Sequence, residues 1–251
     1  MPPVTEFALI HLLPNPSPHT TDNTNQNTTT TAATTTPIPP NFLSALASAM
    51  RDQDTWHAAA FPSLPSSAAA RAAVWFRQVE DPAWLLTTAR WESVAAHWDW
   101  IRSEENQRVM GGLEEGIVPG DTVLFHVVGG LFGGEDRGGG EGGGLGSLLE
   151  SAVISVGRMF VKRAERGGFE AKFEEVRGIL EEYARPHLVR FGWREDVEEG
   201  AEEEEFVVVC GWDSVEQHFA FAETEEFARY GELRELIARV DLKHYKPLPL
   251  E

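Results

Sequence analysis

Two histidines, His97 and His218, occupy the same place in a stretch that the chain contains twice. Residues 91–105 (WESVAAHWDWIRSEE) return 121 positions later as residues 212–226 (WDSVEQHFAFAETEE). Histidine titrates near neutral pH, so this pair is a candidate for acid or base chemistry on a ligand. The alternative is that each is a structural histidine at the edge of the core, hydrogen-bonded to a carbonyl. Recurrence in both copies favours this alternative, because a duplicated enzyme needs only one working site.

The first half of the chain offers a second set of chemically capable residues. His11 and His126 lie on its predicted first and last strands, and alignment of the halves places Phe160 opposite His11. An aromatic-walled pocket with few polar groups suits a planar aromatic ligand, although tryptophans also serve as core residues. The candidate catalytic residues are therefore His11, His97 and His126, and the candidate ligand-binding residues are Trp75, Trp100 and His218.

Other kinds of site lack a sequence signal. The chain has no His-x-x-His or His-Glu-x-x-His spacing, and its one cysteine, Cys210, lies in an apolar strand-like run. One cysteine cannot build a structural zinc site or an intramolecular disulfide. The glycine run 129–146 is not followed by the Lys-Ser/Thr of a phosphate-binding loop. We expect neither a metal nor a cofactor.

The net charge of -19 limits the classes of partner. Nucleic acids and anionic membranes are bound by clustered Lys and Arg, and the chain has no such cluster. It also lacks a basic signal-peptide start and any apolar run long enough to span a membrane. We expect a soluble, cytoplasmic protein whose partner is a hydrophobic or aromatic small molecule.

Three segments of biased composition divide the 251 residues. The Thr/Asn/Pro-rich segment 14–40 predicts a disordered insertion, and the Gly-rich segment 129–150 predicts a linker. The acidic segment 195–205 predicts a long solvated hairpin loop, for which recruitment of a basic partner is a weaker hypothesis. The predicted domains are residues 1–13 plus 41–128, and residues 151–251.

Each domain shows the same predicted order of elements. In the first domain we expect strands at 5–13, 74–79, 84–89 and 121–128, with helices over 41–50 and from 94. In the second we expect strands at 153–162, 187–193 and 206–210, helices over about 169–183 and 215–239, and a short strand near 244–245. This βαββαβ order is the ferredoxin-like unit, so the fold class is α+β.

The repeated stretch itself carries helix-start signals. Ser93 and Ser214 follow predicted strands and are suited to cap the next helix, with Gln217 completing a Ser-x-x-Gln capping box. Ser103 and Thr224, each followed by two glutamates, predict a second cap where the helix restarts. Spacing of three and four residues predicts a sheet-facing stripe in each copy, at Val94, Trp98 and Ile101 and at Val215, Phe219 and Ala222.

The pattern Trp-[Asp/Glu]-Ser-Val-x-x-His after a strand, with an aromatic helix and Ser/Thr-Glu-Glu, resembles the antibiotic biosynthesis monooxygenase-like group of the dimeric α+β barrel superfamily. More narrowly, it resembles the fungal proteins that carry two such domains in tandem. The resemblance implies that the two units join their sheets into one intramolecular barrel, a pseudo-dimeric monomer for which further homo-oligomerisation stays open. Closure of a barrel also removes exposed edge strands.

The resemblance implies two functions of different class. Several enzymes of the group carry a histidine nine residues after the aromatic that opens the motif, a position held here by Trp100 and Phe221. The first hypothesis is therefore a small-molecule-binding barrel without that catalytic histidine. The second is a cofactor-independent monooxygenase or cyclase acting on an aromatic polyketide-like substrate, with His11, His97 or His126 as base.

Overall fold

The computed structural model describes residues 2–14, 37–132 and 148–250. Its first half contains β1 (Val4–His11), α1 (Pro40–Ala60), β2 (Val74–Gln78), β3 (Trp84–Trp91), α2 (Val94–Ile101), α3 (Glu104–Leu113) and β4 (Val123–Val128). Its second half contains β5 (Val153–Lys162), α4 (Arg166–Tyr183), β6 (Val189–Trp193), β7 (Glu203–Trp212), α5 (Val215–Phe221), α6 (Phe227–Tyr230) and β8 (Arg239–Pro247). Short 3-10 helices lie at Glu114–Gly116, Leu148–Glu150, Arg163–Glu165 and Gly231–Leu236.

The described strands form one antiparallel sheet in the order β4-β1-β3-β2-β8-β5-β7-β6. Each half contributes four strands in the same internal order, and the ladder between β2 and β8 joins them. At the other end, β4 meets β6 through the bridge between Val127 and Arg194, which nearly closes the sheet into a barrel. Two ferredoxin-like units thus form one intramolecular α+β barrel, which confirms the predicted fold class.

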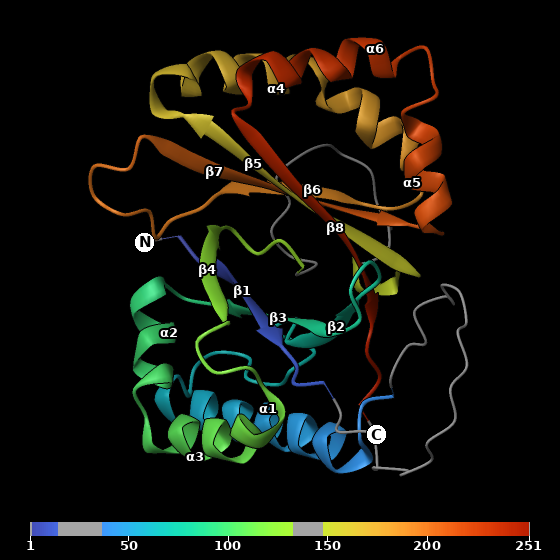
Figure 1. Ribbon diagram of the computed structural model, residues 1–251. Coiled ribbons are helices and arrows are strands. Elements are labelled where there is room, and N and C mark those ends of the chain that lie inside the picture. The colour runs from blue at the N-terminus through green and yellow to red at the C-terminus, as the bar shows by residue number, and fades with distance from the viewer. Residues whose placement is uncertain (1, 15–36, 133–147, 251) are drawn as a thin grey trace, which may run out of the picture.

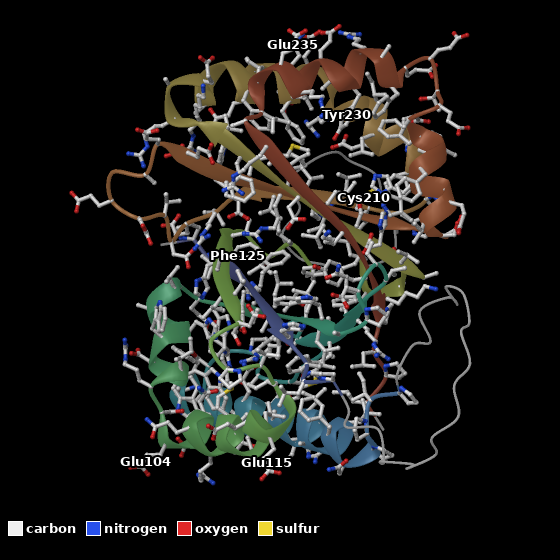
Figure 2. The ribbon with its side chains drawn as sticks, viewed as in Figure 1. Glu104, Glu115, Phe125, Cys210, Tyr230 and Glu235 are labelled. Atoms are coloured by element: carbon white, nitrogen blue, oxygen red, sulfur yellow. The ribbon has the colours of Figure 1, made fainter. Side chains whose placement is uncertain are left out.

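The halves stack so that helices lie outside and sheets lie inside. Figure 1 shows α1, α2 and α3 covering the first four strands, and α4, α5 and α6 covering the others, with the two sheet faces opposed between them. The side chains between those faces make the central core, where Phe125 of β4 lies (Figure 2). That core is tightly filled, by residues that include Phe7, Phe76, Phe125, Val156, Val209 and Tyr245.

Gly192 is the residue that allows β6 to approach β4 closely. A Cβ at this position would lie 2.6 Å from the Val128 carbonyl oxygen and 2.8 Å from Val127 Cγ1. Real Cβ atoms do not come so near to backbone, so any side chain here would push the strands apart. We call this junction of β4 with β6 the seam.

The two predicted low-complexity segments, 14–40 and 129–150, fall largely outside the described residues. At the described ends of the Gly-rich segment, Leu131, Phe132 and Leu148 are buried in the central core. Apolar residues next to the glycine run gain free energy by entering the barrel, which composition alone did not reveal.

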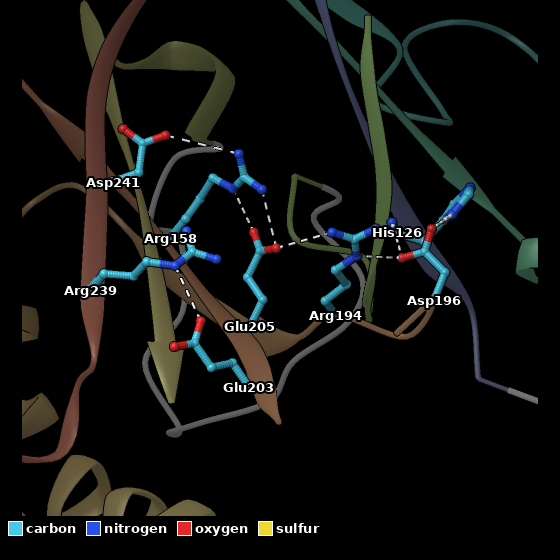
Figure 3. Close-up of polar contacts among 8 residues, drawn as sticks. All are labelled: His126, Arg158, Arg194, Asp196, Glu203, Glu205, Arg239 and Asp241. Carbon is cyan, nitrogen blue, oxygen red and sulfur yellow. Dashed lines mark hydrogen bonds and ion pairs between the residues drawn. The ribbon is translucent and has the colours of Figure 1, made fainter. Parts of the chain in front are cut away.

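The acidic segment 195–205 is also only partly a solvated loop. Strand β7 begins within it, at Glu203, and Glu205 is just 3% exposed. Arg158 and Arg194 both donate to the Glu205 carboxylate, at 2.5 and 3.2 Å, which compensates the burial of its charge. Figure 3 shows this group, which lies beside the seam.

The repeated stretch begins helices as predicted. Ser93 Oγ accepts from Ala96 N at 3.1 Å, and Ser214 Oγ accepts from Gln217 N at 3.2 Å. Ser103 caps α3 in the same way. Thr224 Oγ1 accepts from Phe227 N at the start of α6, although Glu226 holds the N-cap position of that helix. The stripe prediction is wrong for three residues, since Trp98, Phe219 and Ala222 are exposed. The helix predicted over 215–239 is instead α5, α6 and a 3-10 helix, because the chain turns around Thr224.

Candidate functional site

A chain of polar side chains begins at His97, in the first turns of α2. The Ser93 cap fixes the start of that helix and so sets the direction of His97, whose ring stacks on Trp91 with centroids 4.5 Å apart. His97 Nδ1 lies 2.7 Å from Nε2 of His126 on β4, and both side chains are buried. The structural alternative of a histidine bonded to a carbonyl is therefore replaced by a buried histidine–histidine pair.

Each end of this pair meets a carboxyl group. On one side, Glu6 Oε2 lies 3.3 Å from His97 Nε2 and accepts the Trp91 indole N–H at 2.8 Å. On the other side, Asp196 Oδ2 lies 3.1 Å from His126 Nδ1, and its Oδ1 accepts the His126 backbone N–H at 3.1 Å. Asp196 belongs to the loop between β6 and β7 of the second half, so this series of polar side chains crosses the seam (Figure 3).

The second half contains a related arrangement. His218 of α5 stacks on Trp212, and its Nδ1 lies 2.8 Å from His244 Nε2. His244 Nδ1 lies 2.5 Å from Glu80 Oε1, a residue of the loop between β2 and β3 in the first half. Each half therefore places one carboxylate against a histidine of the other half. The residues that link the halves are His126 and His244, and the motif's histidines, His97 and His218, contact them from within the same half.

A cavity of about 210 Å³ lies between the sheet and the helices of the first half. Strands β1 and β2 and helices α1, α2 and α3 supply most of its walls, which are largely apolar: Ala8, Ile10, Met50, Trp75, Trp100, Val109, Met110 and Leu113. Its polar groups include Glu6 and His97, so the chain of side chains opens into it. The Nε1 of Trp75, a residue only 5% exposed, has no hydrogen-bond partner.

The second half has an aromatic cluster between α4 and the sheet, and an open groove of about 580 Å³ lies beside it, lined in part by Phe173, Phe191 and Phe206. Strand pairing places Phe191 where the first half has Trp75, since these residues pair with Val208 and Thr87, which are 121 positions apart. Phe191 packs against Phe173 and Phe206 with ring centroids within 6 Å (4.8 and 5.8 Å). Ser155 and His218, the counterparts of Glu6 and His97, do not line that groove.

Burial changes the proton affinities along the chain. Desolvation raises the pKa of Glu6 to about 7, although the Trp91 hydrogen bond and the neighbouring His126 and Arg71 oppose it. Burial, with the adjacent His126, lowers the pKa of His97 well below its ordinary value. For Asp196, burial would raise the pKa, but hydrogen bonds from His126 and Arg194 hold it below the ordinary value. Glu6 therefore exchanges protons near neutral pH while His97 stays neutral.

The structure brings four of the six candidate residues of the sequence together. Trp75, Trp100 and His97 line the cavity, and His126 lies directly behind His97. His11 lies elsewhere, paired with Asp121 at 2.5 Å and stacked on Trp84. His218 lies in the second half and does not line the cavity. His126 has a counterpart in the second half, because His244 occupies the equivalent place.

Sequence reasoning missed Glu6 and Asp196. A glutamate among apolar residues of a strand, in Val4-Thr5-Glu6-Phe7-Ala8, breaks the apolar pattern of a sheet face and was the available signal for Glu6. Asp196 had no local signal, because it lies in an acidic run where one carboxylate looks like the next.

Other site types are absent from the described residues. No group of three or more His, Cys, Asp or Glu side chains among them is arranged to hold a metal ion. Among the helices of residues 2–14, 37–132 and 148–250, none is both long and apolar enough to cross a membrane.

Comparison with known proteins shows the fold. No protein-family model matches the chain, and no curated protein matches it. A Fusobacterium nucleatum protein named "Putative monooxygenase" is similar in structure, with a TM-score of 0.56, 8% identity, and coverage of 100% of this chain and 94% of that one. An anthrone oxidase-like protein aligns at TM-score 0.55 and 14% identity, covering 99% and 92% of the two chains. The chain has the dimeric α+β barrel fold.

A mutant chlorite dismutase of Candidatus Nitrospira defluvii shares this barrel, with a TM-score of 0.55, 11% identity, and coverage of 99% and 92% of the two chains. Proteins with different names thus share the barrel, so the fold alone does not assign a reaction. The finer resemblance to fungal tandem proteins stays a prediction.

Proposed function

We propose that this barrel binds a small, planar, largely apolar molecule in the cavity of its first half. The observation that carries the proposal is the unpartnered indole N–H of Trp75 at the cavity wall. A buried donor without a partner costs about 1–3 kcal/mol, which an oxygen atom of a bound ligand would recover. The ligand therefore carries a carbonyl or hydroxyl oxygen on an aromatic or alicyclic body.

The volume limits the size of that ligand. An apolar cavity of about 150 Å³ holds benzene, whereas drug-sized ligands occupy roughly 300–1,000 Å³. The 210 Å³ of this cavity suit one substituted ring or a compact pair of fused rings. Larger polyketide-like molecules would have to extend beyond it.

A second candidate function is catalytic, and Glu6 favours it. A carboxyl group with a pKa of about 7 in an apolar cavity is suited to accept a proton from an enol or phenol at neutral pH. The O–H electron pair stays on the ligand as an enolate or phenolate. That anion can attack a carbonyl of the same molecule, as in a cyclase, or react with dioxygen, as in a cofactor-independent monooxygenase. Glu6, rather than a histidine, is the base in this proposal.

Binding is tested by titrating the protein with one- and two-ring phenols and ketones, of which 2-naphthol is the first probe, in a calorimeter. We expect saturable 1:1 binding, weakened about 3- to 10-fold in Trp75→Phe, which keeps the ring but removes the N–H. Trp84→Phe, outside the cavity, is the matched control and should bind as wild type does. Equal affinities in wild type and Trp75→Phe, or no binding by any probe, would contradict the proposal.

The catalytic candidate has a separate test, oxygen uptake or product formation with each ligand that binds. Glu6→Gln keeps the size and polarity of the side chain but cannot accept a proton at neutral pH. Turnover should fall by at least 100-fold in this variant, since general-base catalysis contributes about 100- to 10,000-fold. If the wild-type protein binds a ligand but does not turn it over, the catalytic candidate is rejected and the binding function stands.

A further inference from the structure

We propose that Glu6, His97, His126 and Asp196 form a proton relay that connects the first-half cavity with solvent at the seam. The inference rests on the proposed function in one respect, namely that Glu6 is the group that meets the ligand. It goes beyond that function because it assigns a role to Asp196, a residue of the other half that cannot touch the ligand. Asp196 is in this sense a positioning and proton-accepting residue.

The relay has continuous geometry. Its successive heavy-atom separations are 3.3 Å from Glu6 to His97, 2.7 Å from His97 to His126, and 3.1 Å from His126 to Asp196. The two histidines between the carboxyl groups are 3% and 0% exposed at their side chains. Asp196, by contrast, is 22% exposed, so water reaches the outer end of the chain and not its middle.

The hydrogen bonds also have a consistent direction. His126 Nδ1 faces a carboxylate oxygen, so it carries the hydrogen, and the relay assigns Nε2 as the acceptor. That acceptor faces His97 Nδ1, which must donate, and this leaves His97 Nε2 as the acceptor toward Glu6. Burial keeps the pKa of His97 well below its ordinary value, so the ring is neutral as this pattern requires.

One passage of a proton outward involves three transfers. The Glu6 hydroxyl proton moves to His97 Nε2, the proton of His97 Nδ1 moves to His126 Nε2, and the proton of His126 Nδ1 moves to Asp196 Oδ2. Glu6 ends as a carboxylate and Asp196 as a carboxylic acid, which releases its proton to water. No net charge remains on either ring, and passage of a proton inward restores the starting tautomers. A buried base could thus be reset without solvent entering the cavity.

The second half supplies a built-in comparison. His218, His244 and Glu80 repeat the outer part of the chain, but Ser155 takes the place of Glu6. The Ser155 hydroxyl accepts the Trp212 indole N–H at 2.9 Å and cannot serve as a neutral-pH acid. Only in the first half does a histidine–histidine–carboxylate group end on a second carboxyl at a cavity. If these residues served only to link the two halves, the histidine–histidine–carboxylate group that both halves contain would be enough.

The test follows proton exchange at Glu6 in ligand-free protein, so its result does not depend on whether any ligand binds. Near pH 6 the Glu6 carboxyl is mostly protonated, and its C=O infrared stretch shifts when the acidic hydrogen is replaced by deuterium. Glu6→Gln, which removes the band, identifies it. Rapid mixing into D2O then measures the exchange rate. We expect at least a tenfold slower exchange in Asp196→Asn and a wild-type rate in the matched second-half variant Glu80→Gln.

Equal exchange rates in wild type and Asp196→Asn would show that Glu6 exchanges through the cavity itself, and would overturn the relay. A second measurement needs no variant and so holds even if Asp196→Asn fails to fold. In ¹⁵N-histidine-labelled wild type, we expect hydrogen on Nδ1 of both His97 and His126 and a coupling across their N–H···N bond. A protonated Nε2 on His97, or no coupling, would also overturn the relay.

Discussion

Glu6 and Ser155 occupy equivalent positions in the two halves of the barrel. Glu6 pairs with His126 across β1 and β4, and Ser155 pairs with His244 across β5 and β8. Each accepts the indole N–H of the tryptophan that opens its copy of the repeat. The same structural hydrogen bond is thus accepted by a titratable residue that lines a cavity in the first half, and by a neutral hydroxyl in the second half. This difference, rather than the shared histidines, separates the halves chemically.

Replacing Glu6 with Gln should change how stability depends on pH. The folded state raises the pKa of Glu6 from 4.5 to about 7, so its contribution to stability is present below pH 4.5 and is lost as pH rises through 7. A shift of this size corresponds to about 3 kcal/mol. The free energy of unfolding of Glu6→Gln relative to that of wild type, measured with urea, should rise by about that much between pH 4 and pH 8. Ser155→Ala is the control, and a parallel pH profile for Glu6→Gln would contradict the assignment.

His218 should have the opposite effect, in acid. Burial and the adjacent His244 lower its pKa to about 4, so the stability that it contributes is complete above pH 6.5 and is lost as pH falls through 4. This amounts to about 3 kcal/mol. The variant His218→Gln should therefore lose less stability than wild type between pH 7 and pH 4, in the same unfolding assay. The neighbouring Phe219→Leu should follow wild type, and a His218→Gln curve that did so too would refute the prediction.

A methyl group at the seam should cost stability. In Gly192→Ala the new Cβ meets the Val128 carbonyl oxygen at 2.6 Å, and overpacking of this kind costs about 1–3 kcal/mol. Gly178→Ala, on α4, is the matched control, since nothing lies within 4 Å of its new Cβ. Alanine in place of a helical glycine should stabilise the protein by roughly 0.5–1 kcal/mol. Thermal unfolding should show a lower unfolding temperature for Gly192→Ala and a higher one for Gly178→Ala. Equal shifts in the two variants would argue against a tight seam.

Two tryptophans of α2 should respond differently to truncation. Trp100 is 4% exposed and packs against Trp56 with ring centroids 5.5 Å apart, whereas Trp98 is 39% exposed. Trp100→Ala should lose about 3–5 kcal/mol of unfolding free energy, the range for buried aromatic truncations. Trp98→Ala should lose about 1 kcal/mol or less. A comparable loss in both would mean that the exposed tryptophan has a partner outside this chain.

The duplicated stretch made the fold predictable. Its serine caps act within a few residues, so Ser93, Ser103 and Ser214 begin helices wherever the rest of the chain lies. The order of strands and helices followed from local periodicity in the same way. Which side of α2 packs on the sheet was less predictable. Trp98 and Trp100 are both aromatic, and only the sheet beneath the helix decides which of them is buried.

The candidate site was predictable only in part. Trp75, Trp100 and His97 could be suspected from residue type, because aromatic and imidazole groups suit ligand sites. His11 was suspected on the same ground, but its strand carries it to Asp121 and away from the cavity. Residue type says what a side chain can do, and it does not say which neighbour the side chain will have.

The sequence by itself determined two ferredoxin-like units, their helix caps and their apolar cores, since these depend on short-range spacing and composition. Only the tertiary structure decided that Glu6 and His97 line a cavity of the first half, and that Asp196 and Glu80 each contact the opposite half. Those contacts join residues 70 and 164 positions apart. They exist because closing the barrel brings each hairpin loop against the other unit, and no local pattern in the chain encodes that meeting.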